Sequence, residues 1–384
     1  MALDLFASLA DDERLHPDFL TVRDSSMMEP ARAMMDHVAR NMEDPDGNFV
    51  QQFQTHGFNA RVFELYLNAM FEQEGHVIDR SHDRPDFLLS KDGLTVAVEA
   101  VTANAAPTRE FRRYDQTPSD MPRTLEDIFR YLMHEVAIRV GSPLFSKLRK
   151  RYWALPHVRG RPLVLAVQNF HDGGLGLSAA SVSQYVYGVH HRHEFDSEGN
   201  LSVEGEALLT HDASKTIPSN FFGQSDAENI SAILFCNAGT VPKFGRLGQQ
   251  GSFRSNSVQM VRMGHCWDPN PNAASHDNFA YLVGDPYFPV EPWRDGAVLM
   301  HNPNALHPVP LGWMGVCAEE QLQPGGTVVP VMNDPFHVYM SSTLHLPGTM
   351  PPEEVDRIVE AQMRIMQAGQ ALGEDWRREW GGRR

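Results

Sequence analysis

Cysteine is scarce in this sequence. Cys236, Cys266 and Cys317 are the only cysteines in 384 residues, and they are odd in number and widely separated. Neither a disulfide framework nor a zinc site has such spacing. The three side chains are therefore predicted to be reduced thiols, as in a cytoplasmic protein.

Long apolar runs are also lacking, and no stretch reaches the length of a membrane-spanning helix. The opening "MALDLFASLADDERL" has no basic segment followed by an apolar core, so we expect no signal peptide. Internal repeats and low-complexity tracts are absent as well. With 42% hydrophobic and 21% charged residues, the composition predicts a soluble globular chain without a membrane partner.

Basic residues are outnumbered, since the net charge is −16. The charge is unevenly distributed, however. Residues 109–161 hold 12 Lys and Arg against 6 Asp and Glu, a local +6, so the rest of the chain carries −22. This segment is either a solvated helix face or a basic surface beside an active site.

The hydrophobic patterns predict helix, strand, hairpin, helix and strand in that order, which is a mixed α/β core. The core helix is "FNARVFELYLNAMFEQEG", and the hairpin is "PDFLLS", "KDG" and "LTVAVEAVT". Turn signals dominate between residues 241 and 350. We therefore divide the chain into a helical arm, the α/β core, a loop-rich α+β region and a terminal helix, at residues 1–55, 56–175, 176–348 and 349–384.

Two carboxylates stand at the open end of the predicted hairpin. Around a turn at Lys91 to Gly93, facing positions sum to about 185, which makes Asp86 and Glu99 cross-strand neighbours. Adjacent carboxylates repel, and a hard divalent cation such as Mg²⁺ is a common reason to keep them together. The alternatives are a solvated pair, or ion pairs with Arg80 or Arg84.

The run "ARVFELYLNAMFEQEGHVI … RPDFLL … LTVAVEAVTAN" resembles the core of the PD-(D/E)XK nuclease superfamily, over about residues 58–170. The resemblance implies a restriction-endonuclease-like fold in which Asp86, Glu99 and the Ala100 carbonyl hold Mg²⁺ or Mn²⁺. It also implies that Glu64 lies at the edge of the site. The C-terminal half resembles only uncharacterised bacterial proteins.

The family's motif lysine is missing, because Val101 occupies its position. That lysine orients the attacking water and stabilises negative charge. We predict that Lys147, in "SKLRKRYW", reaches the site instead. Thr102 and Gln168 are further polar candidates near the strand ends. Lys150 and Arg151 are expected to bind the substrate backbone.

Two weaker patterns occur in the second half of the chain. "NAGTVPKFGRLG" is turn-rich, and Lys243 and Arg246 in it are candidates for binding a phosphate, or are surface charges. Gly174-x-Gly176-x-x-Ala179 is close to a dinucleotide-binding fingerprint. Flexible-loop glycines are the competing interpretation of that stretch.

The leading hypothesis is metal-dependent hydrolysis of phosphodiester bonds in nucleic acid, with DNA ahead of RNA. Glu64, Asp86, Glu99 and Lys147 would carry the reaction. The second hypothesis is a degenerate nuclease-like fold that binds nucleic acid or a protein without cutting. The third is a nucleotide-binding oxidoreductase that uses the glycine loop. A homodimer is left open.

Overall fold

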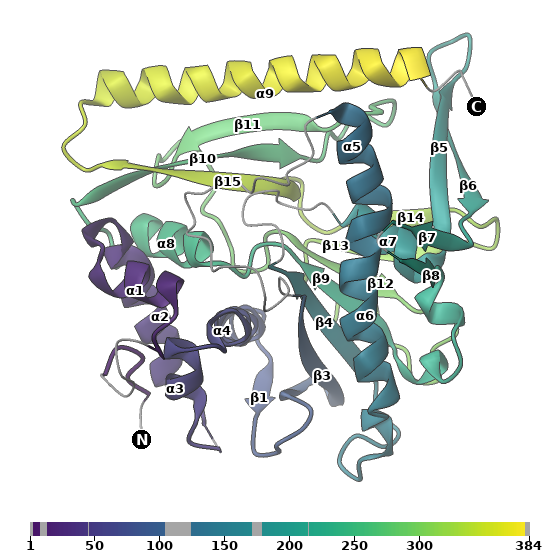
Figure 1. The fold of residues 1–384 in the computed structure, drawn as a ribbon, viewed down its shortest axis with the longest axis horizontal. Helices are drawn as coiled ribbons and strands as arrows, with labels where there is room; N and C mark the ends of the chain where they lie inside the picture. Colours follow the sequence, from purple (N-terminus) through teal and green to yellow (C-terminus); the bar gives the residue numbers. More distant parts are fainter. Residues whose placement is uncertain are drawn as a thin grey trace.

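The computed structural model describes residues 3–7, 14–44, 46–103, 124–170, 179–213 and 215–380, and side chains are not described for 125, 126, 129 and 372–380. It has mixed α/β content, with one large mixed sheet and helices on both of its faces (Figure 1). Element labels follow Figure 1, and η marks short 3₁₀ or π-helical turns.

The N-terminal region is helical, as predicted, and its last helix is the amphipathic core helix expected from the sequence. Its elements are α1 (Pro17–Asp24), η2 (Ser26–Met28), α2 (Glu29–Arg40), α3 (Phe49–Gln54) and α4 (Phe58–Gln73). Apolar side chains are buried almost all round α4, because this helix lies between the main sheet and the helical arm.

Within the described residues the main sheet has eight strands, in the order β1-β2-β3-β4-β9-β12-β13-β14. They are β1 (Val77–Asp79), β2 (Phe87–Lys91), β3 (Leu94–Ala103), β4 (Leu163–Asn169), β9 (Ala232–Cys236), β12 (Ala297–His301), β13 (Ala318–Leu322) and β14 (Val328–Met332). The first three strands are antiparallel neighbours, and β4 lies parallel to β3. The predicted order of helix, three strands, helix and strand is thus present.

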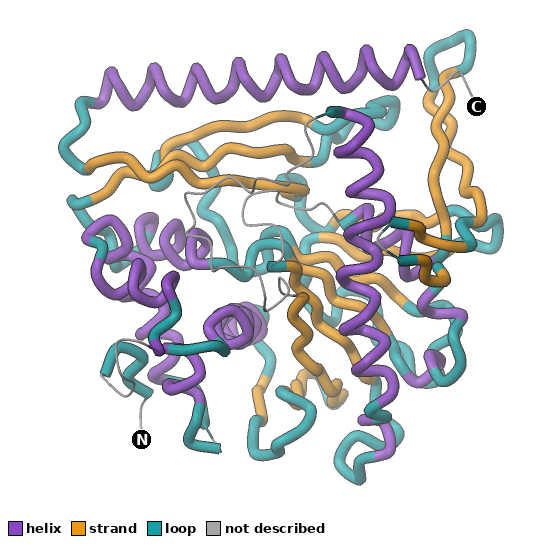
Figure 2. The backbone as a smooth tube through the Cα atoms, in the orientation of Figure 1, coloured by secondary structure: helices purple, strands orange, loops and turns teal. Residues whose placement is uncertain are grey.

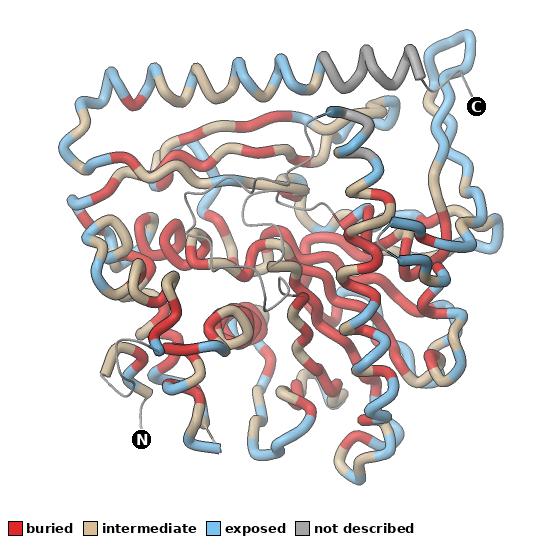
Figure 3. The backbone as a smooth tube through the Cα atoms, in the orientation of Figure 1, coloured by how far each residue is buried: buried red, intermediate tan, exposed pale blue. Residues whose placement is uncertain are grey.

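Helices cover the two faces of this sheet differently. Val96 and Val98 of β3 pack toward α4 and the helical arm, while Ala97 and Val101 pack toward the opposite face. That opposite face is covered by two helical segments, α5–η3–α6 and α7; the elements there are α5 (Leu125–Arg130), η3 (Tyr131–Glu135), α6 (Val136–Arg149), η4 (Tyr152–Ala154) and α7 (Ala180–Tyr187). The central strands are the most continuously buried part of the chain (Figure 3).

Strand β3 extends beyond its neighbour β2. The pairs of β2 and β3 end at Phe87 and Val98, whose numbers give the predicted sum of 185, whereas β3 stays paired with β4 as far as Ala103. Among the described residues, one edge of β3 is therefore left without a strand from Glu99 onward. Asp86 precedes Phe87 and lies at the beginning of this open edge.

The region that we expected to be dominated by turns contains regular structure. "VPKFGRLGQQ" is a helix, α8 (Val241–Gln250), with Pro242 in its first turn. A separate sheet is formed by β11 (Asp277–Leu282), β10 (Val258–Cys266) and β15 (Val338–Pro347), with α9 (Pro352–Trp380) along it (Figure 2). The prediction of turns was wrong here because glycine and proline mark only the connections, and the strands between them include β10 with nine residues and β15 with ten.

The remaining elements are two hairpins and two short turns: β5 (Val189–Phe195), β6 (Leu201–Ala207), β7 (Thr210–Asp212), β8 (Thr216–Pro218), η5 (Phe221–Gly223) and η6 (Ala227–Asn229). The β5–β6 hairpin projects from the body of the chain (Figure 1). Four strands of the main sheet, β9 and β12 to β14, come from beyond residue 175, so the sheet continues across the boundary drawn there from the sequence. None of the described helices combines the length and apolar character that a membrane crossing requires.

Candidate active site

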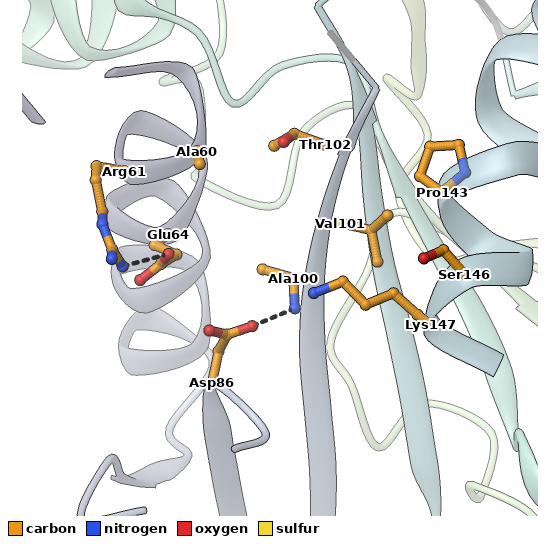
Figure 4. A pocket seen from close by; sticks show the side chains of 10 residues that line it. All are labelled: Ala60, Arg61, Glu64, Asp86, Ala100, Val101, Thr102, Pro143, Ser146 and Lys147. Atoms are coloured by element: carbon orange, nitrogen blue, oxygen red, sulfur yellow. Dashed lines mark hydrogen bonds and ion pairs between the residues drawn. The ribbon is translucent and has the colours of Figure 1, made fainter. Parts of the chain in front are cut away.

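A cleft of about 310 Å³ opens between α4 and α6, over the open edge of β3. Ala60, Arg61 and Glu64 line it from α4, and Pro143, Ser146 and Lys147 line it from α6; the floor is formed by Asp86, Ala100, Val101 and Thr102. Figure 4 shows Glu64 on α4 bonded to Arg61, Asp86 turned toward the backbone of Ala100, and Lys147 extending from α6 toward β3. The cleft thus gathers several residues that the sequence analysis selected.

Asp86 occupies the place that a next residue of strand β2 would take. Its Oδ2 accepts a hydrogen bond of 2.7 Å from the backbone N–H of Ala100, a group on the open edge of β3 (Figure 4). Burial, and after it the negative charges of Glu64 and Glu99, raise the pKa of Asp86 to about 8, while the Ala100 N–H and Lys147 act in the opposite direction. Asp86 forms no ion pair within the described part of the chain. Its ionised form therefore lacks a cation of its own.

Glu99 is 4% exposed and lies on the α6 side of β3. Its Oε1 accepts hydrogen bonds from Lys147 Nζ and, at 2.8 Å, from the Tyr152 hydroxyl. Burial and the Glu99 charge raise the pKa of Tyr152 well above its ordinary value, so this hydroxyl keeps its proton and acts as a donor. Both donors use the same oxygen, which leaves Oε2 of Glu99 for another partner.

Glu64 is held by two arginines. Arg61 Nη1 lies 2.7 Å from its Oε1, and Arg80 Nη2 lies 2.8 Å from its Oε2. The pairs that we considered for Asp86 and Glu99 are formed elsewhere, since Arg80 binds Glu64 and Arg84 binds Asp83.

Lys147 lies in the last turn of α6 and pairs with Glu99. Its side chain is 23% exposed. Val101, where the resemblance would place a lysine, is 2% exposed and packs into the core under α6. A lysine at position 101 would have to leave this apolar contact. The sequence of α6 supplies the ammonium from the facing helix instead.

Lys150 and Arg151 lie at the end of α6 and are exposed, but neither lines the cleft. Lys150 lies over the ring of Tyr152, with Nζ 5.9 Å from the ring centroid. Arg151 pairs with Asp226 at 3.9 Å. Both side chains are accessible from solvent beside the helix end that carries Lys147.

The surroundings of Gln168, Lys243 and Arg246 do not favour the substrate-binding role predicted for them. Gln168 is fully buried, and its amide exchanges two hydrogen bonds of 2.9 Å with the backbone of Gly239. Lys243 and Arg246 are buried on α8, where both bind Glu291, at 2.8 and 2.7 Å. These side chains hold the interior together, and the turn-like sequence gave no sign that a helix would bury them.

The glycine fingerprint falls mainly outside the described residues, because Gly174 and Gly176 lie in the stretch 171–178 and only Ala179 is described. The strand after α7 does not continue the main sheet. β5 pairs with β6 in a separate two-stranded sheet instead of lying parallel to β4. This arrangement disfavours a dinucleotide-binding βαβ unit.

Two residues of the site, Tyr152 and Arg61, were not predicted from the sequence, and Arg80 was considered only as a partner of Asp86 or Glu99. Arg61 precedes Glu64 by three positions on a predicted helix, which is a spacing that brings side chains together. Tyr152 directly follows the basic run of α6. A search for donors around each acid would have selected both of them.

The acidic side chains and the backbone carbonyl around the cleft are candidate ligands for a divalent cation. In the described part of the chain, no group of three or more His, Cys, Asp or Glu side chains is arranged to hold a metal ion. Glu64 and Glu99 turn toward their cationic partners, which accounts for this. The remaining donors fit Mg²⁺, because Asp86 and Ala100 line a space that admits water and offer hard oxygens to it. Glu99 does not line this space itself, but it bonds to Lys147, which does.

Comparisons of the chain with protein-family models, with curated proteins and with solved structures gave no match.

Proposed function

We propose that the chain is a metal-dependent nuclease of the PD-(D/E)XK type and that the cleft between α4 and α6 is its active site. The observation that carries the proposal is that Asp86 and Lys147 line one cleft at the open edge of β3, where Lys147 bonds to Glu99 and the charge of Glu99 acts on Asp86. The active site of PD-(D/E)XK nucleases combines an acid at the start of one strand, an acid on the next strand and an ammonium group beside them. The order of α4, β1 to β3, α6 and β4 supports the same proposal.

Each residue has a separate task in this proposal. A divalent cation held by Asp86, Glu99 and the Ala100 carbonyl would supply an activated water and neutralise the phosphate. Lys147 orients the attacking group and stabilises negative charge as it develops. Tyr152 fixes Glu99, and Thr102 lines the floor where the substrate backbone passes.

The test is a cleavage assay on single- and double-stranded DNA and RNA, with Mg²⁺ or Mn²⁺ present and then removed by EDTA. Cleavage that requires the metal and is abolished in Asp86→Ala and Glu99→Ala supports the proposal. Glu72→Ala is the matched control, because Glu72 is an exposed acid on α4 outside the cleft. Metal-dependent binding without cleavage of any substrate would instead favour the degenerate, binding-only nuclease fold.

A further inference from the structure

The acids of the cleft are already matched by cations of the chain. Glu64 binds Arg61 and Arg80, and Glu99 binds Lys147. Counted with Asp86, three carboxylates face three basic side chains, so the free cleft offers no excess negative charge. A hard divalent cation is held mainly by such an excess. The metal must therefore bring an anion with it, or bind weakly.

One of the arginines has a donor to spare. The Arg80 side chain is 10% exposed, and its Nη1 is buried with no hydrogen-bond partner among the described residues. The guanidinium lies 4.8 Å from the ring centroid of Phe87, which holds it in place. A buried guanidinium N–H without a partner is costly unless a ligand oxygen meets it.

Arg80 and Arg61 both line a second cavity of about 170 Å³. Arg61 and Asp86 line this cavity and the cleft alike, so the two spaces meet where the metal donors lie. At that junction Arg80 has the unpartnered Nη1, which matches an oxygen of a phosphate group. Arg61 adds a second positive charge there, with its N–H groups bonded to Glu64, Gln52 and Asn48.

We propose that the cleft binds a divalent cation and a phosphate group together, each raising the affinity for the other, with Arg61 and Arg80 as partners of the phosphate. This rests on the proposed function, in that the cleft is taken as the metal and phosphodiester site. The metal supplies positive charge that the phosphate needs, and the phosphate supplies negative charge that the balanced cleft lacks.

The outer wall of the second cavity fits this coupling. Asp44, Asp46 and Asp83 line it beside the arginines. Asp44 accepts a hydrogen bond from the backbone of Phe49, and Asp83 pairs with Arg84, but the acids still repel an anion that arrives alone. Phosphate is therefore expected to bind weakly until a cation is present, just as the metal is expected to bind weakly until an anion is present.

The coupling is measured by calorimetric titration of Mg²⁺ into the full chain, with and without a short phosphorothioate oligonucleotide that resists cleavage. We expect the Kd for Mg²⁺ to fall about tenfold or more when the oligonucleotide is present. Thermodynamic linkage requires the same factor in the affinity for the oligonucleotide when Mg²⁺ is added. Affinities that agree within twofold in both directions would overturn the coupling.

Variants assign the effect to the arginines. Arg80→Gln should bind Mg²⁺ more tightly alone and lose most of the coupling, because Glu64 is then partly released. Arg192→Gln removes an exposed arginine paired with Glu206 on the β5–β6 hairpin, and it should keep the wild-type factor. If Arg80→Gln does not fold, Arg61→Gln provides the same measurement. An unchanged coupling factor in the folded arginine variant would overturn the role of the pair.

The two proposals fail separately. Mg²⁺-dependent cleavage with uncoupled metal binding contradicts only the coupling. Absence of Mg²⁺ binding with and without oligonucleotide contradicts the metal site itself, and with it the proposed function.

Discussion

Lys147 on α6 donates a hydrogen bond from Nζ to Oε1 of Glu99 on β3, 48 positions earlier in the chain. The two elements pack face to face, and Glu99 is 4% exposed at their contact. A buried carboxylate is destabilising without a partner, so this ammonium helps to make an acid tolerable at the position. It also brings a cation to the cleft that Val101 does not supply.

In the proposed nuclease, Lys147→Met should reduce the rate of cleavage by about 10²-fold, as the loss of one charge-stabilising group does in enzymes. Lys150→Met is the matched control, because Lys150 lies three positions along, is exposed and does not line the cleft. It should weaken binding in a salt-dependent manner and leave kcat unchanged. Single-turnover rates at several salt concentrations separate the two effects. Equal kcat values in both variants would remove Lys147 from the reaction.

Tyr152→Phe removes the hydroxyl that donates a hydrogen bond to Glu99 and leaves the aromatic ring in place. Because hydrogen bonds to a charged group contribute about 1.5–3 kcal/mol, we expect kcat to fall about tenfold with little change in KM. Tyr187→Phe removes another buried hydroxyl, one that bonds to the carbonyls of His301 and Glu320 away from the cleft. It should alter stability and not kcat. A normal kcat for Tyr152→Phe would show that Lys147 alone positions Glu99.

The core elements could be predicted because their signals are local. The turn "KDG" determined the register of β2 and β3, and the apolar pattern of α4 identified the helix that packs on them. That register predicts that Asp86 and Glu99 lie near each other at the end of the hairpin. The reach of Lys147 could also be anticipated, since α6 directly precedes β4 and must cross the sheet.

Long-range partners were not predictable in the same way. Gln168 and Gly239 are 71 positions apart, and nothing near either residue signals their contact. The helix α8 was missed because "NAGTVPKFGRLG" has glycines and a proline, while its burial is decided by packing against α2. Charged side chains in such a segment look like surface residues until Glu291, far along the chain, is placed beside them.

Glu291→Gln should destabilise the fold without acting on the cleft. Burial alone would raise the pKa of Glu291, but Arg246, Arg262 and Lys243 hold it well below its ordinary value, so the group is ionised at neutral pH. Removing its charge leaves buried cations uncompensated, at a cost of about 3 kcal/mol or more. Glu206→Gln, at an exposed pair, should change stability by less than about 1 kcal/mol. Urea unfolding of both variants measures the difference, and similar values would contradict the structural role of the cluster.

Asp86→Asn should stabilise the metal-free protein at neutral and alkaline pH, because burial and the neighbouring carboxylates disfavour the ionised form of Asp86. The pKa of Asp86 rises from its ordinary 3.8 to about 8, mainly through burial and then through the charges of Glu64 and Glu99. A raised pKa means that the contribution of Asp86 to stability is fully present below pH 3.8 and is lost as the pH approaches 8. Asparagine has no proton to lose and can still accept the Ala100 N–H. The Tm of Asp86→Asn should therefore exceed that of the wild type by an amount that grows with pH and reaches at least about 2 °C by pH 9 in EDTA.

Saturating Mg²⁺ should reverse the order of the two Tm values, since a ligand stabilises the form that binds it. Glu72→Gln, an exposed acid on α4, serves as the control and should show no such trend. A Tm difference that stays constant from pH 5 to pH 9 would mean that Asp86 is not the strained acid of the site.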